Sequence, residues 1–274
     1  MSSYQLHCHH HLGDHTKAPL LLVHGVCHNS QCWDTSYVRF FTARGHDVYT
    51  LSLRGHGTDR RCLDQYGLED YVEDVLAALA QLDGKAVLIG HSMGGALVQK
   101  AMSRASEKIA AVVLLASMVP GSMTALEKLL LLRKPSCVLA LRRLLASQPL
   151  SPKQINQLPF FMGRLSEQQV HCVARWLQPE SKKALRELGN FTTQGGTQPF
   201  PLLVLGSRQD YLFGARPLQR TATHYRTSAI VLEQGCHDLM LDPDWFSSAT
   251  CIAGWLDDHL PCHSLSQHKV TSSK

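Results

Sequence analysis

Ala86-Val87-Leu88-Ile89-Gly90-His91-Ser92-Met93-Gly94-Gly95 is the stretch from which the fold of this chain can be inferred. It opens with four apolar residues that suit a buried strand, and residues 96–105 after it suit a helix. Gly-x-Ser-x-Gly between a strand and a helix predicts a tight turn, the nucleophile elbow, which exposes the Ser92 hydroxyl. A chance glycine-rich turn is the alternative, and the flanking strand and helix make it the weaker hypothesis.

Short apolar segments alternate with amphipathic ones on both sides of this turn. The segments with the character of buried strands are 20–24, 47–51, 86–89, 109–116, 202–205 and 229–232. Helical periodicity is expected in 30–44 and 68–82, and in a last helix that begins at Asp242-Pro243. The pattern predicts an α/β fold, in which helices cover both faces of a mostly parallel sheet.

The alternation stops between residues 120 and 198. This stretch contains helical segments at 124–133, 136–147, 166–177 and 179–188, separated by prolines, and no convincing strand. An all-helical insertion between two core strands predicts a cap over the active end of the sheet. The expected organisation is therefore a core made of 1–119 and 199–260, a helical cap at 120–198, and a disordered polar tail at 261–274.

Composition narrows the classes of function. The 274 residues are 44% apolar with a net charge of +5, and lysine and arginine are scattered, which argues against nucleic acid as a partner. Nine cysteines without a Cys-x-x-Cys pair suggest reduced thiols in a cytoplasmic protein. The start of the chain lacks the pattern of a signal peptide, and charges and Pro135 interrupt the apolar stretch 126–145, which excludes an ordinary transmembrane helix.

The histidine-rich run His7-Cys8-His9-His10-His11 has the composition of a metal-binding tract. No acidic or cysteine partner set completes a site, so we favour a polar start to the chain, with Cys8 on an edge strand. The prediction is that the chain holds no metal.

A serine hydroxyl needs a base within hydrogen-bond reach and an acid that orients the base. His237 follows the last expected strand, and Asp210 follows the strand 202–205, so both lie at carboxyl ends of strands, where such groups belong in a parallel sheet. Asp238 is the competing acid, but it adjoins His237 and is expected to cap the turn. The predicted catalytic residues are Ser92, Asp210 and His237, in that chain order.

Acyl transfer also requires hydrogen-bond donors for the developing oxyanion. The backbone N–H of Met93, directly after the nucleophile, is one candidate. The second donor is expected from the loop after the first strong strand, and we assign it to the N–H of Val26.

The motifs together resemble the α/β-hydrolase superfamily, in the serine esterase and lipase-like branch with a helical cap. The matching pieces occur in family order and are His24-Gly25 and the segments 54–57, 90–95, 206–210 and 235–239. Two departures are visible. Cys236 stands where the family usually has glycine before the catalytic histidine, and the chain before residue 19 is short for the family's first two strands, so an edge strand is expected to be missing.

The resemblance implies a serine hydrolase that cleaves a carboxylic ester, or a thioester, lactone or amide, through an acyl-enzyme. Two alternatives keep the same fold. One is an enzyme that resembles hydroxynitrile lyases or cofactor-free peroxidases and uses the same triad, and the other is a non-catalytic receptor for a small molecule. No cofactor is expected in any of the three.

The cap is rich in leucine and methionine, so the substrate is expected to carry an apolar acyl or aromatic group. Residues expected to line its pocket are Trp33, Met118, Phe160, Phe161 and Trp176. Basic residues between leucines in 126–145 would also suit contact with a membrane surface, and we favour packing within the protein instead. The oligomeric state stays open.

Overall fold

The computed structural model describes residues 6–34, 36–58, 60, 62–121 and 132–260. Within them a seven-stranded sheet has the order β1-β3-β2-β4-β5-β6-β7. Its strands are β1 (His7–His11), β2 (Leu20–Val23), β3 (Val48–Ser52), β4 (Ala86–His91), β5 (Ile109–Leu115), β6 (Leu202–Ser207) and β7 (Ala229–Leu232). Only β1 is antiparallel to its neighbour, and the other pairs are parallel. The fold class expected from the sequence is therefore confirmed.

The central strands are apolar because both of their faces are covered. All residues of β2 and β4 are buried, and successive side chains of β2 enter opposite cores: Leu20 and Leu22 one, Leu21 and Val23 the other. The edge strand β1 is only partly buried, and histidines dominate it. In the described residues one strand, β1, precedes β2.

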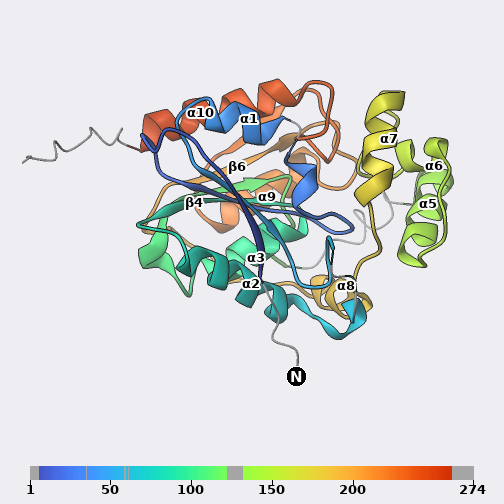
Figure 1. Cartoon of the computed structure of the whole chain (residues 1–274), viewed down its shortest axis with the longest axis horizontal. Coiled ribbons are helices and arrows are strands. Elements are labelled where there is room, and N and C mark those ends of the chain that lie inside the picture. Colours follow the sequence, from blue (N-terminus) through green and yellow to red (C-terminus); the bar gives the residue numbers. More distant parts are fainter. Residues whose placement is uncertain (1–5, 35, 59, 61, 122–131, 261–274) are drawn as a thin grey trace, which may run out of the picture.

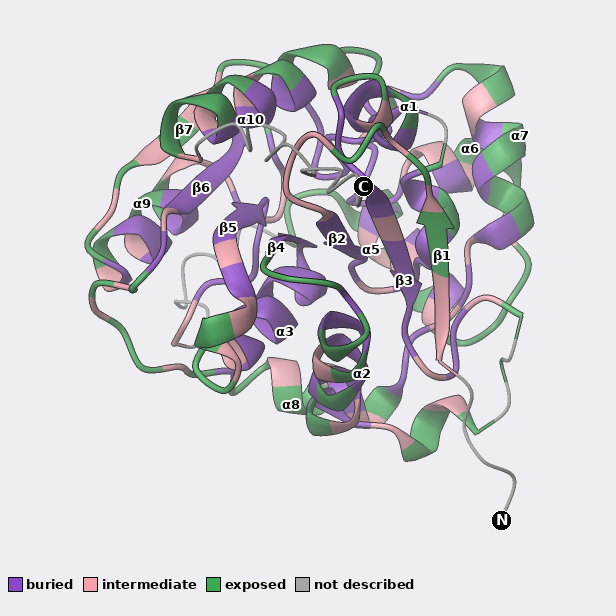
Figure 2. Cartoon of the chain, turned by 60° about the vertical axis from the view of Figure 1, so that its left-hand side comes forward, coloured by how far each residue is buried: buried purple, intermediate pink, exposed green. Residues whose placement is uncertain are grey.

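Helices form a layer on each face of the sheet (Figure 1). One layer contains α1 (Tyr37–Thr42) and α10 (Trp245–His259), and the other contains α2 (Leu68–Ala80), α3 (Met93–Ala101) and α9 (Ala215–His224). Figure 2 shows buried residues on the strands and exposed residues on the outer helix faces. Short 3-10 turns at Ser30–Cys32, Leu63–Gln65 and Ser106–Lys108 complete the connections.

Between β5 and β6 the described residues contain only helices and loops. These helices are α5 (Pro135–Leu145), α6 (Pro152–Asn156), α7 (Glu167–Trp176) and α8 (Lys182–Leu188). Three of them lie together beside one end of the core, and α8 lies apart from them near α2 (Figure 1). Most of the expected helix 124–133 lies outside the described residues. The expected tail at 261–274 lies wholly outside them. The division into core and cap stays a prediction.

Two expected helix starts are wrong. The helix expected over 30–44 is a 3-10 turn followed by α1, because the Asn29 side chain accepts the Gln31 N–H and closes a tight turn before the helix. Asp242 does not cap the last helix, which begins at Trp245. The Asp242 carboxylate instead accepts the N–H groups of Cys236 and Asp244.

No helix in the described part of the chain is long and apolar enough to span a membrane. The eight described cysteines are free thiols.

Candidate active site

Ser92 occupies the turn between β4 and α3 with φ +54° and ψ −117°. A non-glycine residue at positive φ is strained, and such strain persists only where the surroundings impose it. Close packing imposes it here: a Cβ at Gly90 would lie 2.6 Å from the Gly94 carbonyl oxygen, and a Cβ at Gly94 would lie 2.2 Å from that of Val23. The elbow geometry expected from Gly-x-Ser-x-Gly is present.

The glycine at position 94 gives a prediction with a matched control. In Gly94→Ala the new methyl group meets the backbone oxygens of Val23 and His24, which cannot swing aside, so we expect a loss of stability of about 3 kcal/mol or more. Gly254 is an exposed position in α10 with nothing within 4 Å of the added Cβ. Gly254→Ala should therefore stabilise by about 0.5–1 kcal/mol through helix propensity. Denaturant unfolding of both variants measures the two changes. Equal effects would contradict the elbow packing.

His237 and Asp210 come together at the carboxyl ends of β7 and β6. The His237 Nδ1 donates to Asp210 Oδ2 at 2.8 Å, and both side chains are buried. The second oxygen, Asp210 Oδ1, accepts the N–H groups of Leu212 and Phe213 at 2.7 and 3.1 Å, which fixes the plane of the carboxylate. His237 Nε2 is buried and has no partner among the described residues, so it is free to take a proton.

The elbow and the His237 loop are in direct contact. His91, next to Ser92, donates from Nε2 to the His237 carbonyl oxygen at 3.1 Å, and the two rings lie 4.8 Å apart. Burial lowers the pKa of His91 to about 3, so this ring is neutral.

The segments that carry the two predicted oxyanion donors adjoin Ser92. Met93 is the first residue of α3, and the first N–H groups of a helix have no partner within it. A Cβ at Gly25 would lie 2.8 Å from Ser92 Cβ, which places the loop that carries Val26 directly against the serine. His24 Nδ1 donates to the Gly25 carbonyl at 2.9 Å, and its Nε2 accepts the Leu53 N–H. His24 thereby fixes the peptide plane that contains the Val26 N–H.

Asp238 has a different role from the one expected. Its side chain does not cap the turn: Oδ2 accepts from His28 Nε2 at 2.6 Å, and the other His28 nitrogen, Nδ1, donates to the Val26 carbonyl. Burial disfavours the charged form of both side chains, but the opposite charge and the hydrogen bond of the partner have the larger effect. The pKa of His28 is therefore raised and the pKa of Asp238 is lowered. This buried pair joins the oxyanion loop to the His237 loop.

The pair predicts how stability depends on pH. The folded-state pKa of His28 is raised, so its contribution is full below the unfolded value of about 6.5 and is lost as pH rises through the folded pKa. The folded-state pKa of Asp238 is lowered, so its contribution is present above about pH 3.9 and is lost as pH falls through the folded pKa. The stabilisation by this pair should therefore be greatest between about pH 4 and 6.5.

We expect His28→Gln to lower the melting temperature more at about pH 6 than at about pH 9. His171→Gln is the control, because His171 is an exposed histidine of α7. Thermal melts across this range measure the difference. A deficit in His28→Gln that is the same at every pH would show that the pair is not ionised.

Comparison with known proteins identifies the family. A family model described as the alpha/beta hydrolase family matches residues 20–249. The chain belongs to the alpha/beta hydrolase family. This membership agrees with the resemblance seen in the sequence motifs.

Among relatives, methyl jasmonate esterase 1 of Vitis vinifera is 35% identical over 104 residues, which are 37% of this chain and 40% of that protein. Salicylic acid-binding protein 2 of Nicotiana tabacum is 37% identical over 105 residues, again 37% of this chain and 40% of the relative. The matched stretch thus spans about two fifths of these relatives.

Solved structures resemble nearly the whole chain. An esterase from Thermogutta terrifontis superposes with a TM-score of 0.70 at 18% identity, covering 92% of this chain and 93% of that one. The methylesterase MES16 from Arabidopsis has a TM-score of 0.65 at 19% identity, covering 87% and 99%. At these identities the likeness shows the fold alone.

All five residues expected to line the substrate pocket are buried. Phe160 packs between the rings of His28 and His237, at 5.2 and 6.3 Å, and Phe161 packs on Phe160. Met118 donates its N–H to the Ser92 carbonyl, and Trp33 lies in the core against Tyr37. Trp176 packs against His28 with the two rings tilted and 5.3 Å apart, and it lines a cleft of about 270 Å³ with Met240 and Leu241. Their contact with substrate stays a prediction.

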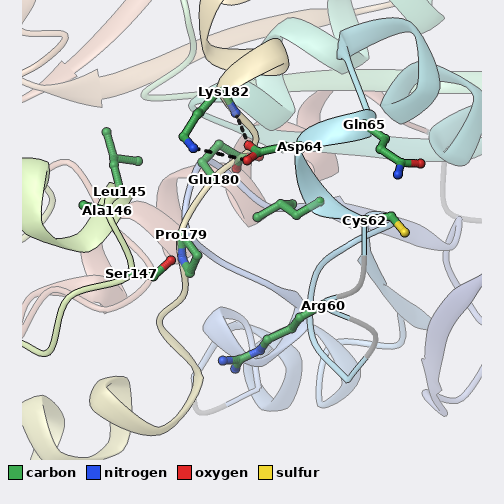
Figure 3. Close-up of a pocket in the computed structure, with 11 residues that line it drawn as sticks. Arg60, Cys62, Asp64, Gln65, Leu145, Ala146, Ser147, Pro179, Glu180 and Lys182 are labelled. Carbon is green, nitrogen blue, oxygen red and sulfur yellow. Dashed lines mark hydrogen bonds and ion pairs between the residues drawn. The ribbon is translucent and has the colours of Figure 1, made fainter.

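A larger cleft lies beside the segment 179–182. It has a volume of about 440 Å³ and is lined by Arg60, by residues 62–65, by residues 145–147 at the end of α5, and by Pro179, Glu180 and Lys182 (Figure 3). Lys182 pairs with Asp64 across one wall, and Glu180 lines the cleft although its side chain is almost wholly buried.

Two groups have the chemistry of metal ligands. Potential ligand atoms of His91, His237 and Asp238 lie within 4.8 Å of one another, but hydrogen bonds already engage each of these side chains. In the run 7–11, His10 and His11 instead approach the carboxylates of Asp47 and Asp34. The prediction of no metal site is left as it stands.

Sequence reasoning missed two residues of the site. His28 does not stand out among the sixteen histidines of the sequence, although it lies four residues after His24 and so falls on the oxyanion loop. Glu180 was read only as part of a helix expected over 179–188. The helix in fact begins at Lys182, where the Ser181 side chain accepts the Ala184 N–H, and Glu180 lies before it with its carboxylate turned into the core.

Proposed function

We propose that this chain is a serine hydrolase that cleaves a carboxylic ester through Ser92, His237 and Asp210. One observation carries the proposal: Ser92 occupies a strained strand-to-helix turn, and the neighbouring loop presents His237, which is held by Asp210 and keeps a buried, unpartnered Nε2. A buried imidazole oriented by a carboxylate and left open on its other nitrogen has the chemistry of a general base.

The proposed reaction forms and breaks an acyl-enzyme. His237 Nε2 takes the proton of the Ser92 hydroxyl while Oγ attacks the substrate carbonyl, and the N–H groups of Val26 and Met93 stabilise the oxyanion. The tetrahedral intermediate collapses, and His237 returns the proton to the leaving alcohol. Water, activated by the same histidine, then releases the carboxylic acid and restores Ser92. The step requires no metal or cofactor.

The proposed substrate is a small ester whose acyl part is apolar or aromatic. The buried ring of Phe160 adjoins His237, and that of Phe161 packs on Phe160; aromatic surfaces of this kind suit such a group. Two matched relatives carry the names methyl jasmonate esterase and methylesterase, which supports methyl esters as the first class to examine. The cap is proposed to set the choice among them.

A panel of methyl, ethyl and p-nitrophenyl esters of acids of increasing chain length, including aromatic acids, tests the proposal. We expect turnover of several members, with rates that vary with the acyl group. Release of hydrogen cyanide from a cyanohydrin without ester turnover would favour lyase chemistry. Tight binding of a panel member without turnover would favour a receptor.

A further inference from the structure

The oxyanion loop is held by hydrogen bonds on several sides. Besides His24 on the Gly25 carbonyl and His28 on the Val26 carbonyl, two cap residues hold the next peptide units. Glu180 Oε2 accepts the Cys27 N–H at 3.2 Å, and the Gln178 N–H donates to the Cys27 carbonyl at 3.1 Å. The backbone groups on both sides of the Val26 N–H are therefore held by hydrogen bonds. The Val26 N–H itself remains available to donate to the substrate.

Cys27 needs these partners because its backbone is strained. Its φ is +65°, a left-handed conformation that costs about 1–2 kcal/mol for a residue with a side chain. The contacts that hold its N–H and its carbonyl both come from the cap. Without them, Cys27 would relax and turn the peptide that joins it to Val26. That turn changes the backbone of Val26 and so redirects the next peptide back, between Gly25 and Val26, whose N–H is the proposed oxyanion donor.

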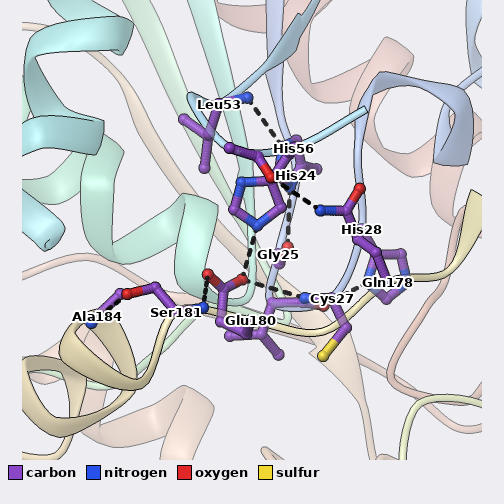
Figure 4. Close-up of polar contacts among 12 residues, drawn as sticks. His24, Gly25, Cys27, His28, Leu53, His56, Gln178, Glu180, Ser181 and Ala184 are labelled. Carbon is purple, nitrogen blue, oxygen red and sulfur yellow. Dashed lines mark hydrogen bonds and ion pairs between the residues drawn. The ribbon is translucent and has the colours of Figure 1, made fainter. Parts of the chain in front are cut away.

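Glu180 is itself rigidly held (Figure 4). Oε2 also accepts from His56 Nε2 at 3.1 Å, and Oε1 accepts from the Tyr71 hydroxyl at 3.1 Å and the Ser181 N–H at 2.8 Å. Burial opposes the charge, but His56 and the backbone N–H donors outweigh burial, so the pKa of Glu180 is below its ordinary value. Each carboxylate oxygen of Glu180 accepts from two donors, so an acceptor is required at both the Oε1 and the Oε2 position.

We propose that Glu180 is a positioning residue of the cap, which sets the direction of the Val26 N–H toward the reacting carbonyl by holding Cys27. The role rests on the proposed Ser92 mechanism. It couples the cap to the chemical step, because a shift of the segment 178–181 would move the oxyanion donor. A substrate that seats the cap correctly would thus also complete the oxyanion hole.

Glu180→Gln tests this role, because an amide NH2 must then face one of the two pairs of donors. Removal of an oxyanion donor costs on the order of a hundred- to a thousand-fold in kcat, and misdirecting one should cost about ten- to a hundred-fold with KM nearly unchanged. Glu187→Gln is the matched control. Glu187 also joins cap to core, through Oε2 and the Leu68 N–H at 2.7 Å, but it lies away from the oxyanion loop, so its kcat should stay within about two-fold of wild type.

Glu180→Asp keeps a carboxylate at this position, but the shorter side chain withdraws it from the Cys27 N–H. This variant therefore separates a loss of positioning from a loss of the buried charge that could impair folding. We expect kcat to fall in this variant too, with KM nearly unchanged. Thermal melts identify an assay temperature at which every variant is folded. Wild-type kcat in a folded Glu180→Gln or Glu180→Asp enzyme, or an equal loss in Glu187→Gln, would overturn the role of Glu180. Absence of ester turnover in the wild type would instead overturn the proposed function.

Discussion

Ser92→Ala is expected to lose ester turnover by a factor on the order of a million while the protein stays folded. The substitution removes the only proposed nucleophile and leaves the packing around it intact, because alanine keeps the Cβ that lies against Gly25. Initial rates on the best ester of the panel, with thermal melts of both proteins, measure the effect.

Ser103→Ala provides the control for this loss. Ser103 follows α3 on the surface, where its hydroxyl donates to the Lys100 carbonyl, and its removal should leave turnover within about two-fold. A folded Ser92→Ala protein that kept more than a tenth of the wild-type rate would show that another group attacks the ester.

Asp210→Asn should cause the second largest loss, and the structure explains why. Leu212 and Phe213 both donate N–H groups to Oδ1, so the asparagine oxygen must occupy that position. The NH2 group then takes the place of Oδ2 and faces His237 Nδ1 as a donor. His237 is forced into the tautomer that carries its proton on Nε2, where it cannot accept from Ser92. In a protease triad such a change lowers turnover about ten-thousand-fold, and we expect at least about a hundred-fold here.

Asp238→Asn is the comparison that separates the two acids. Asp238 bonds His28 and not the Nδ1 of His237, so the folded variant should lose less than about ten-fold in turnover. It should instead melt at a lower temperature, because His28 loses its buried counter-charge. A larger loss of turnover at Asp238 than at Asp210, measured on one ester with both proteins folded, would reverse the assignment of the acid.

The strand alternation and the elbow were predictable because they depend on local patterns. An apolar run such as 86–89 indicates a strand whose two faces are both covered by helices. Glycine is required at position 94 because the start of α3 packs there against the backbone at the end of β2. The placement of Asp210 and His237 followed from a rule of parallel sheets: loops after different strands meet at one edge.

The contacts of the cap with the site were not predictable in this way. Glu180 and Cys27 are 153 positions apart, and a single carboxylate after Pro179 carries no periodicity or motif that points to its partner. Asp242 shows the same limit. An aspartate before proline suggests the N-cap of a helix. The Asp242 carboxylate instead pairs with Arg164, from the segment between β5 and β6, and accepts the Cys236 N–H. Long-range polar partners decide such positions, and a local pattern does not contain them.

The central claim is that Ser92 is an activated nucleophile, and covalent labelling tests it most directly. Wild-type protein is treated with a fluorophosphonate, digested with trypsin and examined by mass spectrometry. The peptide 86–100, which ends at Lys100 and follows Lys85, contains Ser92 as its only serine. We predict one phosphonyl adduct on this peptide, absent in Ser92→Ala and formed much more slowly in Asp210→Asn. An unlabelled peptide 86–100 in protein that hydrolyses esters would contradict the account.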